Sequence, residues 1–389
     1  GNHAVSDARL RAGGQVMREY LKAGTTDGAR LPKMARQQIA ATLSRDLSNC
    51  IVYDRSGTSV SGGAVFAARE GEQRKLIVCG DVSGFIGEAG RVSGSPVTIC
   101  DATQLNLEKL RRAVPWLQPK LTADRPSLGL GDRLGLATPG HIAAAGESSL
   151  MLVLAQQSIR EMTRTHRSAQ EVMGDAIFGV FETGYDHGFG SDADHLKTTD
   201  DVDVTAKAGF SSFTIDPSDH VDDAVEEISK EERELRFRRM IDDGVPGAAE
   251  WRAEYSGRSF TVGDLTVAVD EDALVKAAVK YGRAVAHSVM MASYIAETDP
   301  ESEVELSVDE TEEPTSVVEH LFIAREMQRR GIRLASVAPR FVGAFEKGID
   351  YKGDLVEFED RLKDHMEIAK HFGPYKISVH SGSDKFDVY

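Results

Sequence analysis

The segment Val304-Glu305-Leu306-Ser307-Val308-Asp309-Glu310 begins a pattern that fills the last third of the chain. The pattern is a short apolar strand, then a polar loop, then an amphipathic helix. It recurs at the strand 333–337 and again at the strand 376–380. Parallel strands joined by crossover helices are the expected result, because parallel neighbours cannot be linked by a tight turn.

Polar side chains follow these strands at equivalent places. Glu310 ends the first strand, Arg340 follows the second and His380 ends the third. In a closed barrel of such units, the loops after the strands gather at one face and form the active site. We therefore expect these three side chains to converge, with helices at 316–330 and 355–371 packed on the sheet.

Length and composition restrict the class of protein. The 389 residues are enough for one large barrel and a smaller domain. Lys and Arg number 46 and Asp and Glu 62, so the formal net charge is -16, which argues against nucleic-acid binding. The sequence contains no GxxxxGKS/T loop, no strand-bound GxGxxG and no GxSxG elbow. No motif in the sequence therefore supports nucleotide binding or a serine hydrolase.

The cysteines and the apolar segments indicate a cytoplasmic protein. Cys50, Cys79 and Cys100 are odd in number and have no CxxC spacing, so we expect reduced, buried thiols. No apolar run approaches the roughly 20 residues of a membrane span, and the first residues lack the features of a signal peptide. The expected partner is a small molecule, with neither nucleic acid nor membrane, and the sequence is compatible with a homo-oligomer.

The chain is expected to form two domains. Residues 1–118 predict a small α/β domain, with a helix at 31–46 and strands at 50–54, 63–68, 75–79 and 96–100. Residues 119–389 predict a TIM-like (β/α) barrel as the catalytic domain, with a charged helical insertion near 221–265. The five to seven strand candidates are fewer than eight, so we expect a barrel that is irregular or incomplete at its C-terminus.

The middle of the chain supplies the first part of this barrel. Residues 127–135 predict its first strand, which ends in Asp132-Arg133, and 211–216 predict another that ends in an acid. Residues 155–161 are interpreted as the start of a helical region that continues through 169–182. A long helix is expected at 270–296, where His287 is more typical of a packed histidine than of a ligand.

Acids and a histidine at successive strand ends predict a divalent metal ion. Glu310 and His380 are the best ligands by position, Asp350 is the third, and Asp354 or Asp309 are substitutes. The alternative is that these acids only cap helices or pair with lysines. The donor set does not discriminate between zinc, manganese, nickel and cobalt.

Other polar clusters are candidates for binding or proton transfer. Asp192-Ala193-Asp194-His195 places three potential ligands or proton carriers before Lys197, although such a loop is also typical of a turn. The guanidinium groups of Arg133 and Arg340 could each bind a carboxylate through two hydrogen bonds, or they could have a purely structural role. Backbone N–H groups of the loop Ser381-Gly382-Ser383, with Lys385, could bind a carboxylate or a phosphate.

Taken together, these segments resemble the tagaturonate (fructuronate) epimerase family over roughly residues 125–389. The resemblance is carried by the following blocks: Gly129-Leu130-Gly131-Asp132-Arg133-Leu134-Gly135-Leu136-Ala137-Thr138-Pro139-Gly140-His141, Gln156-Gln157-Ser158, Asp192-Ala193-Asp194-His195-Leu196-Lys197, Thr214-Ile215-Asp216-Pro217-Ser218-Asp219, Ser307-Val308-Asp309-Glu310-Thr311, Ala338-Pro339-Arg340-Phe341-Val342-Gly343, Lys347-Gly348-Ile349-Asp350-Tyr351 and Ser378-Val379-His380-Ser381-Gly382-Ser383-Asp384-Lys385-Phe386. It implies a TIM-like barrel, a divalent metal and the interconversion of two ketohexuronates in hexuronate catabolism.

The two ketohexuronates differ at a carbinol carbon one bond beyond the carbon α to the ketone. The hydrogen on this carbon is not acidified by the ketone, so simple enolisation cannot invert it. Retro-aldol cleavage, rotation of the aldehyde fragment and re-addition would invert it. On this hypothesis Asp194 or Asp132 shuttles the hydroxyl proton, Lys197 steadies the developing oxyanion, and Arg340 with Ser381, Ser383 and Lys385 binds the carboxylate. The alternatives are a metal-dependent sugar aldolase or aldose–ketose isomerase, and a sugar-acid-binding protein without activity.

Overall fold

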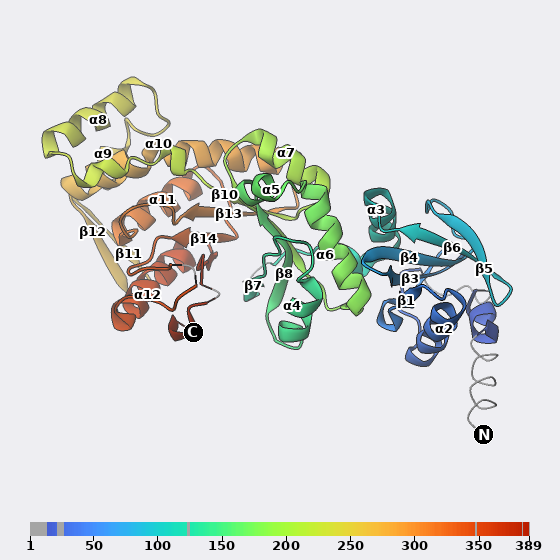
Figure 1. The fold of residues 1–389 in the computed structure, drawn as a ribbon. Helices are drawn as coiled ribbons and strands as arrows, with labels where there is room; N and C mark the ends of the chain where they lie inside the picture. Colours follow the sequence, from blue (N-terminus) through green and yellow to red (C-terminus); the bar gives the residue numbers. More distant parts are fainter. Residues whose placement is uncertain (1–13, 22–26, 123–124, 347, 383, 389) are drawn as a thin grey trace. The chain divides into compact units, whose positions relative to one another are not determined.

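The computed structural model describes residues 14–21, 27–122, 125–346, 348–382 and 384–388. The chain divides into two compact units, which are described separately (Figure 1). The N-terminal unit comprises residues 1–192 and 207–211, and the C-terminal unit comprises residues 193–206 and 212–389.

An antiparallel sheet with the order β1-β3-β4-β6-β5, and with β2 paired to β3, begins the N-terminal unit. Its strands are β1 (Cys50–Val52), β2 (Thr58–Val60), β3 (Gly63–Glu70), β4 (Gln73–Gly80), β5 (Glu88–Val92) and β6 (Ser95–Asp101). Helix α2 (Lys33–Asp46) contributes Leu43 to the fully buried core around Phe66 and Ile77, and α3 (Gln104–Ala113) follows the sheet. The charged turn after β3 is a tight hairpin in which Glu70 pairs with Gln73, and Gly71 adopts the positive φ of 59° that such a turn favours.

Most expectations for this segment are confirmed. The helix expected at 31–46 is α2, and the expected strands at 50–54, 63–68, 75–79 and 96–100 are β1, β3, β4 and β6. The short strand β2 and the largely exposed strand β5 were missed, because neither has an alternating apolar pattern. The three cysteines are free and buried, as expected.

The second half of the N-terminal unit begins the parallel sheet. It contains β7 (Ser127–Gly129), α4 (Thr138–Ala145), β8 (Met151–Ser158), α5 (Ile159–Thr165) and α6 (Ala169–Thr183), and β7 pairs with β8 in parallel. The expectation of a helix from residue 155 was wrong. The run Met151-Leu152-Val153-Leu154 is buried on both faces, which is typical of a central parallel strand, and the helix starts only after Ser158, whose hydroxyl accepts the N–H of Glu161.

The parallel sheet continues through the C-terminal unit. Its strands are β9 (Gly190–Leu196), β10 (Ser212–Ile215), β13 (Glu303–Val308), β14 (Ser336–Pro339) and β15 (Lys376–Ile377). The pairs β10–β13, β13–β14 and β14–β15 are parallel. The hydrogen-bonded order β7-β8-β9-β10-β13-β14-β15 follows the order of the chain without a reversal. Strand β9 occupies a segment that was expected to be a polar loop.

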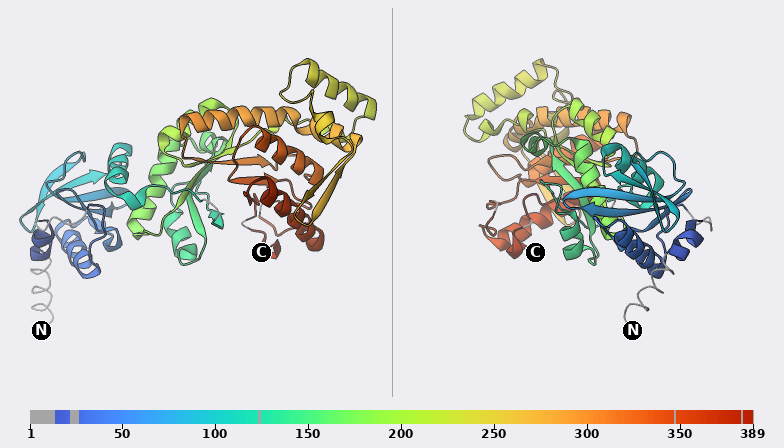
Figure 2. Two further views of the ribbon diagram at one scale, coloured as in Figure 1. Left: turned by 180° about the vertical axis from the view of Figure 1, so that it is seen from behind. Right: turned by 45° about the vertical axis from the view of Figure 1, so that its right-hand side comes forward.

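Helices cover the strands of the C-terminal unit. They are α7 (Thr199–Ala208), α8 (Lys230–Asp242), α9 (Trp251–Tyr255), α10 (Glu271–Thr298), α11 (Val317–Arg329) and α12 (Leu355–Phe372), and a hairpin of β11 (Arg258–Val262) and β12 (Leu265–Val269) precedes α10. Figure 2 shows α10 running past β10 and β13, and it contacts both strands as well as α8 and α11. The helices expected at 270–296, 316–330 and 355–371 are confirmed as α10, α11 and α12.

The architecture is mixed α/β with a seven-stranded parallel sheet in the described residues, which confirms the expected fold class at that level. None of the helices in the described segments combines the length and the apolar character that a membrane crossing requires.

Candidate active site

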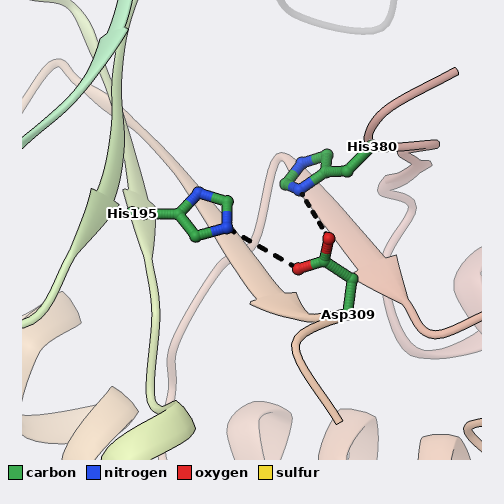
Figure 3. Close-up of side chains that lie close together, drawn as sticks. All are labelled: His195, Asp309 and His380. Atoms are coloured by element: carbon green, nitrogen blue, oxygen red, sulfur yellow. Dashed lines mark ion pairs between the residues drawn. The ribbon is translucent and has the colours of Figure 1, made fainter. Parts of the chain in front are cut away.

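The candidate site lies within the C-terminal unit, at the ends of strands β9, β13 and β15. Figure 3 shows three side chains that point toward one another: His195 from β9, Asp309 just after β13 and His380 just after β15. In parallel strands the C-terminal ends lie at one edge of the sheet, so residues distant in sequence meet there. Of the three residues expected to converge, Glu310, Arg340 and His380, only His380 belongs to this group, and Asp309 lies at its centre.

Asp309 lies between the two imidazole rings. Its Oδ1 is 3.7 Å from Nε2 of His195, and its Oδ2 is 3.4 Å from Nδ1 of His380. The hydroxyl of Ser307 donates to the same carboxylate and fixes its orientation. One donor atom from each of these three residues lies within 4.8 Å of the others, so the group could hold a metal ion.

His195 owes its position to an unusual backbone conformation at the end of β9. Adjacent strand residues normally point to opposite faces, but a φ of 56° at His195 breaks this alternation. Its Nδ1 is consequently 2.7 Å from Oδ1 of the preceding residue, Asp194. Backbone strain of this kind persists only where the surroundings impose it.

His380, which lies just after β15, is held by a contact with β13, on the other side of β14. Its Nε2 is 2.6 Å from Oε1 of Glu305, a β13 residue, and the other oxygen of Glu305 accepts the hydroxyl of Ser336 on β14. These contacts thus connect β13, β14 and the segment just after β15.

The acids of the site control the charge of both histidines. Burial alone would lower the pKa of His195, but the hydrogen bond and charge of Asp194 and the charge of Asp309 raise it to about 9. Burial alone would also lower the pKa of His380, but Glu305 and Asp309 raise this pKa well above its ordinary value. Burial alone would raise the pKa of Asp309, but His380, Ser307 and His195 lower it to about 2. This environment favours positive charge at the histidines' position.

A second group of possible ligands shares His195. It consists of His195, Asp216 at the end of β10, and Glu310, whose Oε1 is 3.6 Å from Nε2 of His195. Lys197 already places a cation beside this group, since its Nζ lies 3.9 Å from Oδ2 of Asp216 and 2.7 Å from Oδ1 of Asp219. Burial would lower the pKa of Lys197, but these acids and Glu310 raise it, so the ammonium stays charged.

Arg340 follows β14, between the strands that carry Asp309 and His380. Its backbone is clamped to the loop after β13, because its N–H donates to Oγ1 of Thr315 at 2.9 Å and its carbonyl accepts the N–H of Thr315 at 2.8 Å. Within the described part of the chain, the half-buried guanidinium has no hydrogen-bond or ion-pair partner. It is therefore a fixed cation that is available to an anionic ligand.

Several residues expected in the site lie in the loops near the C-terminus. Asp350 accepts the N–H of Tyr351 at 2.8 Å, and it belongs to neither group of possible ligands among the described residues. Ser381 is exposed with a φ of 54°. The ammonium of Lys385 is fully buried and donates to Asp384, while Ser383 lies outside the described residues.

Two further expected residues, Asp132 and Arg133, belong to the N-terminal unit. Both oxygens of Asp132 are hydrogen-bonded within its own loop, to the N–H groups of residues 134–137. Burial would raise its pKa, but these four N–H groups lower it. Arg133 donates to Oε1 of Gln157 at 3.3 Å.

The sequence interpretation did not assign a role to Glu305 and ranked Asp309 only as a substitute ligand. A signal for both was present, because Glu305, Ser307 and Asp309 alternate with Leu306 and Val308 along β13. A strand with one polar face inside an otherwise apolar sheet indicates a functional edge.

Comparisons with known proteins point to one enzyme family. A family model described as tagaturonate epimerase matches residues 53–389. A tagaturonate/fructuronate epimerase of Thermotoga maritima is 42% identical over 345 residues, which cover 87% of this chain and 70% of that protein. The crystal structure of a glycerol complex of fructuronate-tagaturonate epimerase from Cohnella laeviribosi superposes with a TM-score of 0.81 at 32% identity, covering 92% of this chain and 72% of that one. The native crystal structure of that enzyme gives a TM-score of 0.81 at 33% identity, with coverages of 90% and 71%.

Proposed function

The chain belongs to the tagaturonate/fructuronate epimerase family, a group of isomerase-class carbohydrate epimerases, and on this premise we propose that it uses a divalent metal ion and retro-aldol chemistry. The observation that supports the proposal best is the position of Asp309 between the imidazoles of His195 and His380. Two neutral imidazoles and one carboxylate are a common ligand set for divalent transition metals, and they leave coordination positions open for a substrate.

These residues fit a metal ion better than the set expected from sequence. Their side chains are only 15 to 21% exposed, and their donor atoms lie close enough to surround one ion. The competing group of His195, Asp216 and Glu310 uses the same histidine nitrogen and has the ammonium of Lys197 beside it, which disfavours a second cation. We therefore propose His195, Asp309 and His380 as the ligands, in place of Glu310 and Asp350.

The reaction requires inversion at a carbon whose hydrogen is not acidified by the ketone. Removing the proton of its hydroxyl allows that C–O bond to become a carbonyl while the bond to the α-carbon breaks and its electron pair passes into an enediolate. The aldehyde fragment then rotates, and re-addition to its other face forms the epimer and takes the proton back. A bound divalent ion supplies electrostatic stabilisation for the negative charge that develops on the ketone side.

Three residues of this chain fit the remaining roles. Glu310 is proposed as the proton carrier, because its carboxylate is 35% exposed and lies beside His195. Lys197 is proposed to steady the oxyanion on the aldehyde fragment. Arg340, with its free guanidinium, is proposed to bind the substrate carboxylate.

The other roles expected from sequence have weaker support. The oxygens of Asp132 are engaged by backbone N–H groups, and Asp194 is hydrogen-bonded to His195. Ser381, Lys385 and Arg133 remain predictions as substrate-binding residues, as does Ser383.

We also propose that the parallel sheet is part of a TIM-like (β/α) barrel. The support is the strand order, which follows the chain without the reversal that defines a doubly wound sheet. Seven strands in the described residues agree with a barrel that lacks a strand.

Incubating the purified protein with D-tagaturonate, with and without added divalent metal after chelator treatment, tests the proposal. Metal-restored formation of D-fructuronate is expected, and a trapping reagent for aldehydes should capture the cleaved fragment. Net accumulation of three-carbon fragments would favour a sugar aldolase instead, and galacturonate would favour an aldose–ketose isomerase. Full activity after complete metal removal would overturn the metal dependence.

A further inference from the structure

We propose that Asp194 and Glu305 are positioning residues that hold the two metal-binding histidines in opposite tautomers, so that an ion is bound by Nε2 of His195 and by Nδ1 of His380. The inference rests on the proposed metal function, and it assigns roles to two residues that contact the histidine ligands. Neither acid belongs to a potential metal-binding group in the described chain.

For His195 the argument follows from its two ring nitrogens. Nδ1 is 2.7 Å from Oδ1 of Asp194, a distance at which Nδ1 must carry the proton that it donates to the carboxylate. Nε2 is then the lone-pair nitrogen of the neutral ring. It is this atom that faces Asp309 and Glu310, at 3.7 and 3.6 Å.

For His380 the same logic selects the other nitrogen. Nε2 is 2.6 Å from Oε1 of Glu305 and therefore carries the proton, so the lone pair of the neutral ring lies on Nδ1. Nδ1 is the atom that faces Asp309, at 3.4 Å. Figure 3 shows these two ring nitrogens facing the carboxylate of Asp309, so the two lone pairs and the carboxylate are directed to one region.

Each positioning carboxylate is itself held in place. The side chains of Asp194 and Glu305 are only 18 and 14% exposed, and the second oxygen of Glu305 accepts the hydroxyl of Ser336. A histidine ligand whose other N–H is bonded to a carboxylate keeps its ring orientation and gains basicity. Asp194 therefore acts on the ion through His195, and Glu305 acts through His380.

Strand β13 provides a matched control for the loss of a buried acid. Glu303 and Glu305 lie on the same face of β13, and each accepts a serine hydroxyl from a neighbouring strand, Ser212 for Glu303 and Ser336 for Glu305. Glu303 accepts the hydroxyl of Ser212, whereas Glu305 is bonded to His380 as well as to Ser336. Glu303→Gln thus removes one carboxylate charge from the same face of the same strand.

The test is a Co2+ titration of the metal-free protein, followed by visible absorption and by competition with a chelator. Asp194→Ala and Glu305→Ala are expected to weaken Co2+ binding about 10- to 100-fold, while Glu303→Gln binds like the parent. Asp194→Asn and Glu305→Gln keep an acceptor oxygen of similar shape and should fall between parent and alanine variant. Urea unfolding of the metal-free proteins separates this effect from a general loss of stability.

The outcomes distinguish the two proposals. If the parent binds Co2+ and the four variants at 194 and 305 bind it equally well, the positioning roles are wrong and the metal site stands. If the parent binds no Co2+, the proposed metal function falls and this inference falls with it. A loss in Glu303→Gln equal to that in Glu305→Gln would assign the effect to charge alone and overturn the tautomer argument.

Discussion

Asp309 lies within ion-pair distance of both imidazoles of the site, which come from positions far apart in sequence. Its contact with His380, 3.4 Å from Oδ2 to Nδ1, spans the strand β14 that separates β13 from β15. The contact is possible because both residues lie just beyond their strands, where parallel neighbours end at the same edge. Asp309 can share a cation with His195 and His380 only while both rings are turned toward its carboxylate.

Asp309→Asn should remove most of the activity without unfolding the protein. The amide keeps the shape of the side chain but loses the charge that a divalent ion requires, so we expect kcat/KM with D-tagaturonate to fall about 100-fold or more. Activity is measured at saturating metal. Asp360→Asn, an exposed change on α12, is the control and should be neutral. Near-parental activity in Asp309→Asn would contradict the proposed ligand set.

Arg340→Met should weaken the binding of sugar acids selectively. Loss of a charge-assisted contact with the substrate carboxylate is expected to raise the KM for D-tagaturonate by about 10- to 100-fold. The neutral ketohexose D-tagatose, used as a competing ligand, should bind the variant and the parent with similar affinity. Equal weakening of both compounds would show that the guanidinium does not recognise the carboxylate.

Stability should decrease in acid through a buried histidine pair. His365 lies on α12 with its Nδ1 2.9 Å from Nδ1 of His320, and burial, with a smaller contribution from Arg361, lowers its pKa to about 4. The unfolded chain binds a proton near pH 6.5 while the folded chain does not, so stability is full above about pH 6.5 and falls as the pH approaches 4. For His365 the loss is on the order of 3 kcal/mol.

Urea unfolding between pH 4 and pH 8 measures this effect. His365→Gln removes the titrating group and should flatten the dependence of the unfolding free energy on pH in this range. His371→Gln, an exposed change on the same helix, should leave the slope unaltered. An unchanged slope in His365→Gln would rule out this source of acid sensitivity.

Glu326, on α11, forms hydrogen bonds with residues of the charged insertion, and its removal should destabilise the C-terminal unit. Its fully buried carboxylate accepts Nε1 of Trp251 at 2.9 Å and the hydroxyl of Tyr255 at 2.7 Å, and it is paired with Arg330. Glu326→Ala leaves these groups without their acceptor, which should cost about 3–5 kcal/mol in urea unfolding.

The matched control is Glu254→Gln, because Glu254 makes a more exposed ion pair with Arg325 at 2.8 Å. Because solvent screens this pair, its loss should lower the free energy of unfolding much less than Glu326→Ala does. Similar losses for the two variants would mean that the contacts of Glu326 contribute no more than a surface pair.

The repeated units of the last third were predictable because their strands and helices carry local signals. Helix α11, for example, starts at a capping box of Ser316 and Glu319 and stops before Gly331. His380 was selected as a ligand for the same reason, because it ends the predicted strand 376–380. The sequence thus directed attention to the strand ends, without giving the set of ligands.

The parts that were missed depend on contacts between distant segments. The end of β8, Ala155-Gln156-Gln157-Ser158, was interpreted as the start of a helix because it is polar, and its pairing with the neighbouring strands of the sheet makes it a strand instead. His195 was a candidate ligand or proton carrier, with a turn as the alternative, and its proposed role depends on Asp309 and on a backbone angle that no residue pattern indicates for histidine. Asp350 was favoured by its position in a loop, but the local N–H of Tyr351 uses that carboxylate.

The left-handed backbone of His195 also affects attempts to make this enzyme more robust. A glycine would adopt that conformation with less strain, but His195→Gly would also remove a buried ring and leave the carboxylate of Asp194 without its partner. We therefore expect this variant to lose heat tolerance together with the imidazole, so a screen for hardier variants should retain the histidine even where turnover is not scored.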